Sequence, residues 1–220
     1  MNSNFNIDHH RHGRTGFSEI VFGKNKDIRT LHNIMREILN VQGKVLVTKL
    51  QPEKYAVLKA EFSPFFYDEV SQTGIVGVQP TEETTAPRIA ILSGGSSDEF
   101  VVNEAYFTLR FLGVAAQRYI DVGVAGIHRL LERVDELRSF DVLIVCAGFE
   151  GALPTIVGGL FPQPVIGVPV SVGYGVSESG MTALHAMLAS CANGITVVNI
   201  DNGFGAAMAA YRIINTNKPR

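Results

Sequence analysis

Residues 88–113, RIAILSGGSSDEFVVNEAYFTLRFLG, indicate the fold class most clearly. Its opening RIAIL (88–92) is almost wholly apolar and predicts a short buried strand. SGGSSDE then supplies turn residues, and FVVNEAYFTLRFLG (100–113) has the apolar spacing of a helix that stops at Gly113. A buried strand that passes through a tight turn into a helix is the repeating unit of parallel sheets.

The same order of strand, turn and helix repeats toward the end of the chain. We expect further strands in VAAQRYID (114–121), DVLIVCAG (141–148), PVIGVPV (164–170) and ITVVNI (195–200), and helices in VAGIHRLLERVDELRSF (124–140), EGALPTIVGGL (150–160), GMTALHAMLASCANG (180–194) and GAAMAAYRII (205–214). Such alternation indicates a parallel sheet with helices on both faces. We therefore predict an α/β fold, a flavodoxin- or Rossmann-like three-layer parallel sheet of at least five strands, whose strand order cannot be read from the sequence.

The residues before this stretch form a separate, smaller unit. A helix is expected near 27–39, with strands in KVLVTKL (44–50) and near 73–78. QPTEETTAPR (79–88) is poor in apolar residues and has two prolines, as is typical of linkers. We predict a small α+β N-terminal domain (1–80), a linker (81–87) and a catalytic α/β domain (88–220).

Composition and charge exclude several classes of function. Nineteen Lys and Arg against 21 Asp and Glu give a formal charge of −2, which argues against binding nucleic acid through bulk electrostatics. The N-terminus has no apolar stretch and the chain has no run of 18 apolar residues, so neither a secretory signal nor a membrane span is expected. Two cysteines form no disulfide framework. We expect a cytoplasmic protein that binds no nucleic acid and no membrane.

The segment 142–200 is almost free of charge. Only Glu150 and Glu178 are charged there, while glycines and prolines divide the segment into short buried elements. A sheet in such a segment needs both of its faces covered, partly by neighbouring subunits. We therefore expect a homo-oligomer.

The turn SGGSSDE (93–99) is a candidate anion site. Gly94 and Gly95 let backbone N–H groups approach a phosphate or carboxylate, Ser96 and Ser97 add hydroxyl donors, and the helix that follows favours negative charge. The alternative is a plain tight turn in which Asp98 caps the helix.

Two further loops at the same edge of the sheet carry candidate side chains. Glu150 is expected to open the helix after the third strand, where a partly desolvated carboxylate suits acid–base chemistry; the alternative is a capping carboxylate.

Asp121 closes the second strand and His128 lies one turn into the next helix. The two could together orient a phosphate or a ribose, or simply form a solvated helix start. Ser171, Tyr174 and Asn202 lie on loops at this edge and could equally be turn residues.

The cysteines and the N-terminal histidines support weaker hypotheses. Cys191 is expected to end a helix, where the helix dipole disfavours a thiolate, and Cys146 lies within a strand. His9, His10 and His12 lie beside Asp8, Arg11 and Arg14 in a segment typical of a mobile cationic arm, with metal binding as the alternative. No Cys and His set has the spacing of a zinc site, so no metal ligand is predicted.

Several of these segments, taken together, resemble one family. SGGSSDEFVVNEA (93–105), DVGVAGIHRLL (121–131), CAGFEGALP (146–154), PVIGVPVSVGYG (164–175) and CANGITVVNIDNGFGAA (191–207) resemble the LarB family, which makes the first intermediate of the nickel-pincer nucleotide cofactor. RTGFSEIVFGKNKD (14–27) resembles the family's leading domain.

The resemblance implies an enzyme, a carboxylase and hydrolase that acts on nicotinic acid adenine dinucleotide. The pyridinium ring is carboxylated by CO2 or bicarbonate and the phosphoanhydride is hydrolysed, which gives pyridinium-3,5-biscarboxylic acid mononucleotide and AMP. Cys191 would be the nucleophile that adds to the ring and Glu150 a proton carrier, so we expect both at the ligand edge of the sheet. An octamer is implied, with no tightly bound cofactor; the need for Mg2+, the group that hydrolyses the phosphoanhydride and the final user of the cofactor stay open.

The predicted substrate-binding residues are those of the loops at this edge. They are Gly94, Gly95, Ser96, Ser97, Asp98, Asp121, Gly123, His128, Gly148, Ser171, Tyr174, Gly175, Asn202 and Gly203.

Two alternatives remain beside this interpretation. Residues 88–211 also resemble, more distantly, the phosphoribosylaminoimidazole carboxylases and mutases of purine synthesis, which place a histidine before the Leu-Pro where this chain has Ala152. Those enzymes also lack the N-terminal domain. The other alternative is a non-catalytic nucleotide-binding protein that has kept the fold.

Overall fold

The computed structural model describes residues 5–80 and 86–216, and the chain divides into two compact units, Met1–Glu82 and Glu83–Arg220. Most of the predicted linker, residues 81–85, lies outside the described residues. In the described part, no helix is both long and apolar enough to cross a membrane.

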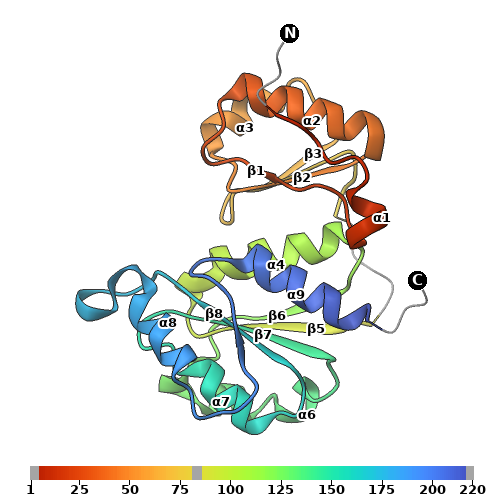
Figure 1. Cartoon of the computed structure of the whole chain (residues 1–220). Helices are drawn as coiled ribbons and strands as arrows, with labels where there is room; N and C mark the ends of the chain where they lie inside the picture. Colours follow the sequence, from red (N-terminus) through yellow and green to blue (C-terminus); the bar gives the residue numbers. More distant parts are fainter. Residues whose placement is uncertain (1–4, 81–85, 217–220) are drawn as a thin grey trace. The chain divides into compact units, whose positions relative to one another are not determined.

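The first unit is a four-stranded sheet packed against helices (Figure 1). Its elements are α1 (Arg11–Thr15), β1 (Val21–Phe22), α2 (Ile28–Gln42), β2 (Val45–Thr48), α3 (Pro52–Leu58), β3 (Phe65–Asp68) and β4 (Thr73–Val76), with strand order β1-β2-β4-β3. Asp27 caps α2 by accepting a hydrogen bond from the Thr30 N–H at 2.8 Å. The sequence predicted α2, β2 and β4, and it missed α1, α3, β1 and β3.

The second unit is a parallel sheet whose strand order is β6-β5-β7-β8-β9. The strands are β5 (Ile89–Ser93), β6 (Ala116–Tyr119), β7 (Val142–Ala147), β8 (Val165–Pro169) and β9 (Thr196–Val197), and every pair of neighbours is parallel. This is the flavodoxin-like order, in which the direction of winding reverses between β5 and β7. The predicted fold class is confirmed.

Helices cover both faces of this sheet (Figure 1). On one face lie α4 (Glu99–Phe111) and α9 (Gly203–Ile214); on the other lie α5 (His128–Leu131), α6 (Val134–Leu137), α7 (Leu153–Leu160) and α8 (Met181–Leu188). Alternate strand residues pack toward opposite faces, so Ile89 and Ile91 contact the first layer while Ala90 and Leu92 contact the second. The strands β5, β7 and β8 are buried on both faces, as their apolar runs predict.

Three helices predicted for this unit differ from those observed. Residues 124–140 form not one helix but a 3-10 turn, Val124–Gly126, followed by α5 and α6, because Arg133 leaves the helical conformation between them (φ −104°, ψ 2°). The helix expected from residue 150 begins only at Leu153, since Phe149 and Gly151 have positive φ. The helix expected to reach residue 194 ends at Leu188.

Candidate active site

A cavity of about 360 Å³ opens at the carboxyl edge of the parallel sheet. Its walls come from the loops that follow β5, β6 and β7, so it lies where the winding of the sheet reverses. Ligands of open α/β sheets bind at this position. Of the predicted site residues, the cavity is lined by Gly94, Gly95, Ser97, Asp98, Asp121, Gly123, Gly148 and Glu150.

The turn after β5 brings an acidic side chain under the cavity. Asp98 is only 3% exposed, and its Oδ2 accepts a hydrogen bond from the Gly95 N–H at 2.9 Å. The pKa of Asp98 is raised to about 6, chiefly because burial disfavours the charged carboxylate. Hydrogen bonds from the backbone of Gly95 and Gly94 lower this pKa, and the nearby Asp201 carboxylate raises it. Ser96 opens the 3-10 turn Ser96–Asp98 but does not line the cavity.

Ser93 joins the first two loops, a role that the sequence did not reveal. Its buried hydroxyl donates to the carbonyl oxygen of Gly95 at 2.9 Å and accepts from the Asp121 N–H at 3.1 Å. The loops touch closely, because a Cβ at Gly123 would lie 2.2 Å from the carbonyl oxygen of Gly94. Only glycine fits this position of the predicted site.

The loop after β6 differs from the expected arrangement. Asp121, held at a φ of 62°, pairs through Oδ2 with Nη1 of Arg129, and not with His128. His128 is the first residue of α5 and does not line the cavity. Arg129 does line it, and among the described lining residues it is the only Lys or Arg. The motif DVGVAGIHR contains both Asp121 and Arg129, but the sequence did not predict that these two residues pair.

Glu150 lies in the turn between β7 and α7. The Gly151 N–H donates to the carbonyl oxygen of Gly148 at 2.9 Å and closes this turn. The Glu150 side chain is exposed and lines the cavity, three residues before α7 begins, so the expectation that it opens the helix is wrong. Gly148 permits a close approach, because a Cβ there would lie 2.4 Å from the carbonyl oxygen of Val172.

The remaining predicted residues lie on the loops after β8 and β9 and do not line the cavity. The Ser171 N–H donates to Asp201 at 2.8 Å, Tyr174 is 78% exposed, and Gly175 has a φ of 58°. Asn202 caps α9 by accepting from the Gly205 N–H at 2.7 Å. A Cβ at Gly203 would lie 2.3 Å from the carbonyl oxygen of Val101 on α4, so this glycine serves helix packing. Their predicted contacts with substrate stay predictions.

Cys191 does not lie where we expected it. It is exposed, follows the end of α8 by three residues and does not line the cavity. Its neighbours lie alongside α7, since the Ser190 hydroxyl is 2.7 Å from that of Thr155 and a Cβ at Gly158 would lie 3.2 Å from Cβ of Ala192. The expectation that Cys191 shares the carboxyl edge with Glu150 is therefore wrong for a single chain. The dipole of α8 also disfavours a Cys191 thiolate less than the sequence indicates, because Cys191 lies beyond the last residue of this helix.

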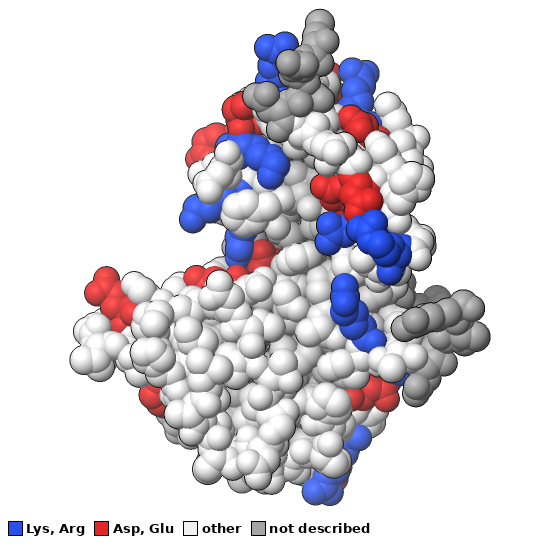
Figure 2. All heavy atoms as spheres, in the orientation of Figure 1, with Lys and Arg blue, Asp and Glu red and all other residues white. Residues whose placement is uncertain are grey.

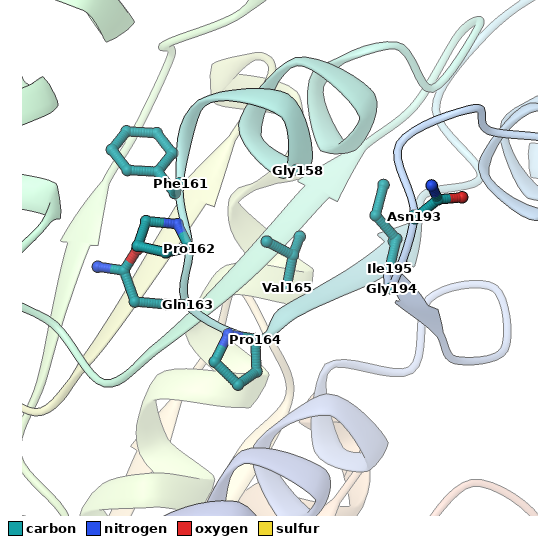
Figure 3. Close-up of a pocket in the computed structure, with 9 residues that line it drawn as sticks. All are labelled: Gly158, Phe161, Pro162, Gln163, Pro164, Val165, Asn193, Gly194 and Ile195. Carbon is teal, nitrogen blue, oxygen red and sulfur yellow. The ribbon is translucent and has the colours of Figure 1, made fainter.

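A second pocket, of about 290 Å³, opens at the amino end of β8 (Figure 3). Figure 3 shows Asn193, Gly194 and Ile195 on one side of it and the segment from Phe161 to Val165 on the other. The segment that carries Cys191 thus runs from the end of α8, alongside α7, toward the edge of the sheet opposite the first cavity.

The N-terminal histidines form no arm. Arg11–Thr15 is the helix α1, Arg14 pairs with Asp8 at 2.6 Å, and His9 contacts Glu37 at 3.0 Å. Within residues 5–80 and 86–216, no group of three or more His, Cys, Asp or Glu side chains is placed to hold a metal ion. The carboxylates around the first cavity therefore offer no ready-made metal site.

Comparison with known proteins places both units. The AIR carboxylase family matches residues 88–220, so the second unit is a domain of the carboxylase and mutase class, and the protein is a carboxylase-type enzyme. The LarB/PurE-like N-terminal domain matches residues 3–78. With this pair of domains, the chain belongs to the LarB family.

The chain is also similar to individual proteins. Uncharacterized protein MJ0165 of Methanocaldococcus jannaschii is 40% identical over 211 residues, which cover 93% of this chain and 81% of that protein. The N5-carboxyaminoimidazole ribonucleotide mutase of Pyrococcus horikoshii is 33% identical over 141 residues, 60% of this chain and 75% of the mutase. The crystal structure of Treponema denticola PurE covers 60% of this chain and 94% of its own, at 18% identity and a TM-score of 0.44.

Proposed function

We propose that this protein carboxylates the pyridinium ring of nicotinic acid adenine dinucleotide with CO2 or bicarbonate and hydrolyses its phosphoanhydride. The products are pyridinium-3,5-biscarboxylic acid mononucleotide and AMP, the first step of nickel-pincer nucleotide cofactor synthesis. The observation that carries the proposal is the cavity at the carboxyl edge, which gathers the Gly94–Asp98 turn, Arg129 and Glu150 in a chain of this family.

Binding of the dinucleotide uses the donors around the cavity. The backbone of Gly94 and Gly95 and the hydroxyl of Ser97 offer neutral donors to a phosphate oxygen, and Arg129 offers charge. Asp121 holds the guanidinium of Arg129 in place. Asp98 lies beneath the turn, where its ionised carboxylate would repel a phosphate; because burial raises the pKa of Asp98 to about 6, this repulsion is relieved only as the pH falls below about 6.

The chemical problem is that an electron-poor pyridinium carbon does not attack CO2. Addition of the Cys191 thiolate to the ring gives an enamine-like dihydropyridine whose neighbouring carbon is nucleophilic. That carbon forms the new bond to CO2, Glu150 accepts the ring proton, and departure of the thiolate restores the aromatic ring. The net change at this carbon is a proton replaced by a carboxylate.

Cys191 reaches the ring, in this proposal, from a second copy of the chain. The thiol is exposed and lies outside its own cavity. Its segment contacts α7 through Ser190 and Ala192, and α7 and α8 expose the apolar side chains Ile156, Leu160 and Leu188. Figure 2 shows a broad face of the second unit almost free of Lys, Arg, Asp and Glu. Such a face favours burial against another subunit. We infer a homo-oligomer, an octamer as the family resemblance implies, in the cytoplasm.

The first test is mass spectrometry of the purified protein with nicotinic acid adenine dinucleotide, bicarbonate and Mg2+. Formation of AMP supports the hydrolysis. A mononucleotide heavier than nicotinic acid mononucleotide by about 44 Da, the mass of CO2, supports the carboxylation. Omission of bicarbonate or Mg2+ shows whether cleavage needs either. If neither product forms while the dinucleotide binds, a non-catalytic nucleotide-binding role replaces the proposal.

Mixed oligomers test where the thiol comes from. Cys191→Ser and Glu150→Gln should each abolish carboxylation with the fold intact. If the site is shared between copies, unfolding and refolding the two variants together restores activity, because some sites then combine an intact Cys191 with an intact Glu150. Activity that is never restored places both residues in one chain's site, and full activity of Cys191→Ser refutes the covalent mechanism.

The second candidate is the mutase reaction of the Pyrococcus horikoshii relative. Ala152 lines the cavity where the purine enzymes carry an imidazole, so their proton carrier is absent from this position. Turnover of N5-carboxyaminoimidazole ribonucleotide by the purified protein would favour this candidate over the pyridinium reaction.

A further inference from the structure

Two aromatic side chains meet beside the carboxyl-edge cavity. Phe149 comes from the loop after β7 and lines the cavity, while Tyr174 comes from the loop after β8. Their ring centroids lie 5.6 Å apart at an interplanar angle of 90°, an edge-to-face contact. Phe149 is 42% exposed and Tyr174 is 78% exposed, so the pair keeps a large aromatic area in water. Exposed aromatic rings at the wall of a cavity indicate a ligand-binding surface, because ligand pockets are commonly lined by aromatic side chains.

The backbone directs the ring of Phe149. Its φ of 52° lies in the left-handed region, which is uncommon for a bulky residue and costs about 1 kcal/mol or more. The Phe149 N–H donates to the carbonyl oxygen of Val172 at 2.9 Å and holds this conformation. Because the ring is half exposed, packing in the core does not offset the strain. Strain of this kind, kept at a cavity, points to a ligand.

The charges around the cavity favour a cationic ligand group near this ring. The exposed carboxylates Asp121 and Glu150 line it, against Arg129 as the only Lys or Arg among the described lining residues. Arg129 is already paired with Asp121, whereas Glu150 adjoins Phe149 in the chain and is exposed. A carboxylate beside a π-face is an arrangement that attracts an aromatic cation.

We propose that Phe149, supported at its edge by Tyr174, is the face on which the cationic aromatic ring of the substrate stacks, with the Glu150 carboxylate beside it. This rests on the proposed function, in which the ring is the pyridinium of nicotinic acid adenine dinucleotide. The stacked ring is held with one face against Phe149, which leaves the opposite face open to a nucleophile. Phe149 is thus a specificity residue that distinguishes a charged ring from an uncharged one.

The test compares two ligands that differ only at the nicotinate ring, which is a charged aromatic ring in one and an uncharged, non-aromatic ring in the other. Nicotinic acid adenine dinucleotide carries a pyridinium, and its reduced form carries an uncharged dihydropyridine on the same dinucleotide frame. All binding is measured by calorimetry without bicarbonate in the Cys191→Ala background, because a thiol adduct would itself favour the oxidised form.

Phe149→Leu should weaken binding of the oxidised form about three- to tenfold and change binding of the reduced form less than about twofold. Phe149→Tyr should keep the preference for the charged ring. The matched control is Phe22→Leu, an equally exposed phenylalanine (47%) on β1 of the first unit, which should change neither affinity. Thermal melting of each variant confirms that the fold is kept.

The outcomes separate this inference from the proposed function. Equal losses for both ligands, or no loss with Phe149→Leu, overturn the stacking role while the dinucleotide remains the substrate. If the parent protein binds neither ligand, the proposed function itself fails, and the stacking inference fails with it.

Discussion

Replacing Asp98 by asparagine tests the electrostatics of the cavity directly. Burial raises the pKa of Asp98 from an ordinary value of 3.8 to about 6, so the folded chain binds this proton more tightly than the unfolded chain does. The stability that the proton provides is present in full below about pH 4 and is lost as the pH rises through 6. A difference of about two pKa units corresponds to about 3 kcal/mol.

Asp98→Asn removes this pH dependence without removing the hydrogen bond. Asparagine keeps an oxygen that can accept from the Gly95 N–H, as Oδ2 of Asp98 does at 2.9 Å. Relative to wild type, the variant should therefore gain about 2–3 kcal/mol of unfolding free energy between about pH 4 and pH 7.5. Because Asp98 is 3% exposed, solvent screening subtracts little from this figure.

Urea titrations at several pH values measure the free energy of unfolding of the variant and of the wild type. The contributions of other titrating groups cancel in the difference between the two. Asp135→Asn is the control for the loss of one negative charge, because it replaces a fully exposed carboxylate on α6. A difference for Asp98→Asn that stays constant with pH would refute the reasoning, since it would mean that Asp98 ionises as it does in the unfolded chain.

Three further substitutions probe the walls of the cavity. Ser93→Ala removes the hydroxyl that bonds the first two loops, and urea titration should show a loss of about 1–2 kcal/mol; an unchanged midpoint would contradict this role. Gly123→Ala places a Cβ where a backbone oxygen already lies and should abolish dinucleotide binding in calorimetry, whereas normal affinity would mean that the loops move apart freely. Arg129→Leu should weaken that binding about tenfold or more, while Arg133→Leu, outside the cavity, should not; equal losses would exclude a specific contact.

Much of the second unit could be predicted because its strands are apolar runs bounded by turn residues. β5, β7 and β8 are buried along their whole length, so the sequence marks them clearly. The helices were less predictable, since continuous apolar spacing over 124–140 does not reveal that Leu130 and Leu137 anchor two separate short helices. Strand order depends on contacts between distant segments, which periodicity does not encode.

The sequence predicted which loops form the candidate site, but not which side chains within it contact one another. The glycine-rich turn and Glu150 do line the cavity, because the carboxyl ends of parallel strands meet at one edge. Arg129 was missed because its pairing with Asp121 is a tertiary contact, and Phe149 because its left-handed backbone leaves no periodic pattern. Cys191 was misplaced because α8 begins after the carboxyl end of β8 and runs back along the sheet, so that the segment after α8 lies by the amino end of β8.

The contact between α4 and α9 has a consequence for how the protein is made. Glu104 on α4 is buried and accepts from the N–H of Phe204 at the start of α9, and Gly203 rests on the backbone of α4. A ribosome-bound chain that ends before α9 leaves this carboxylate and the apolar face of α4 in water. Because α4 follows the Gly94–Asp98 turn that lines the cavity, the support of this wall is completed only when the last helix has emerged. Fragments that stop before α9 should therefore need chaperones rather than bind nucleotide.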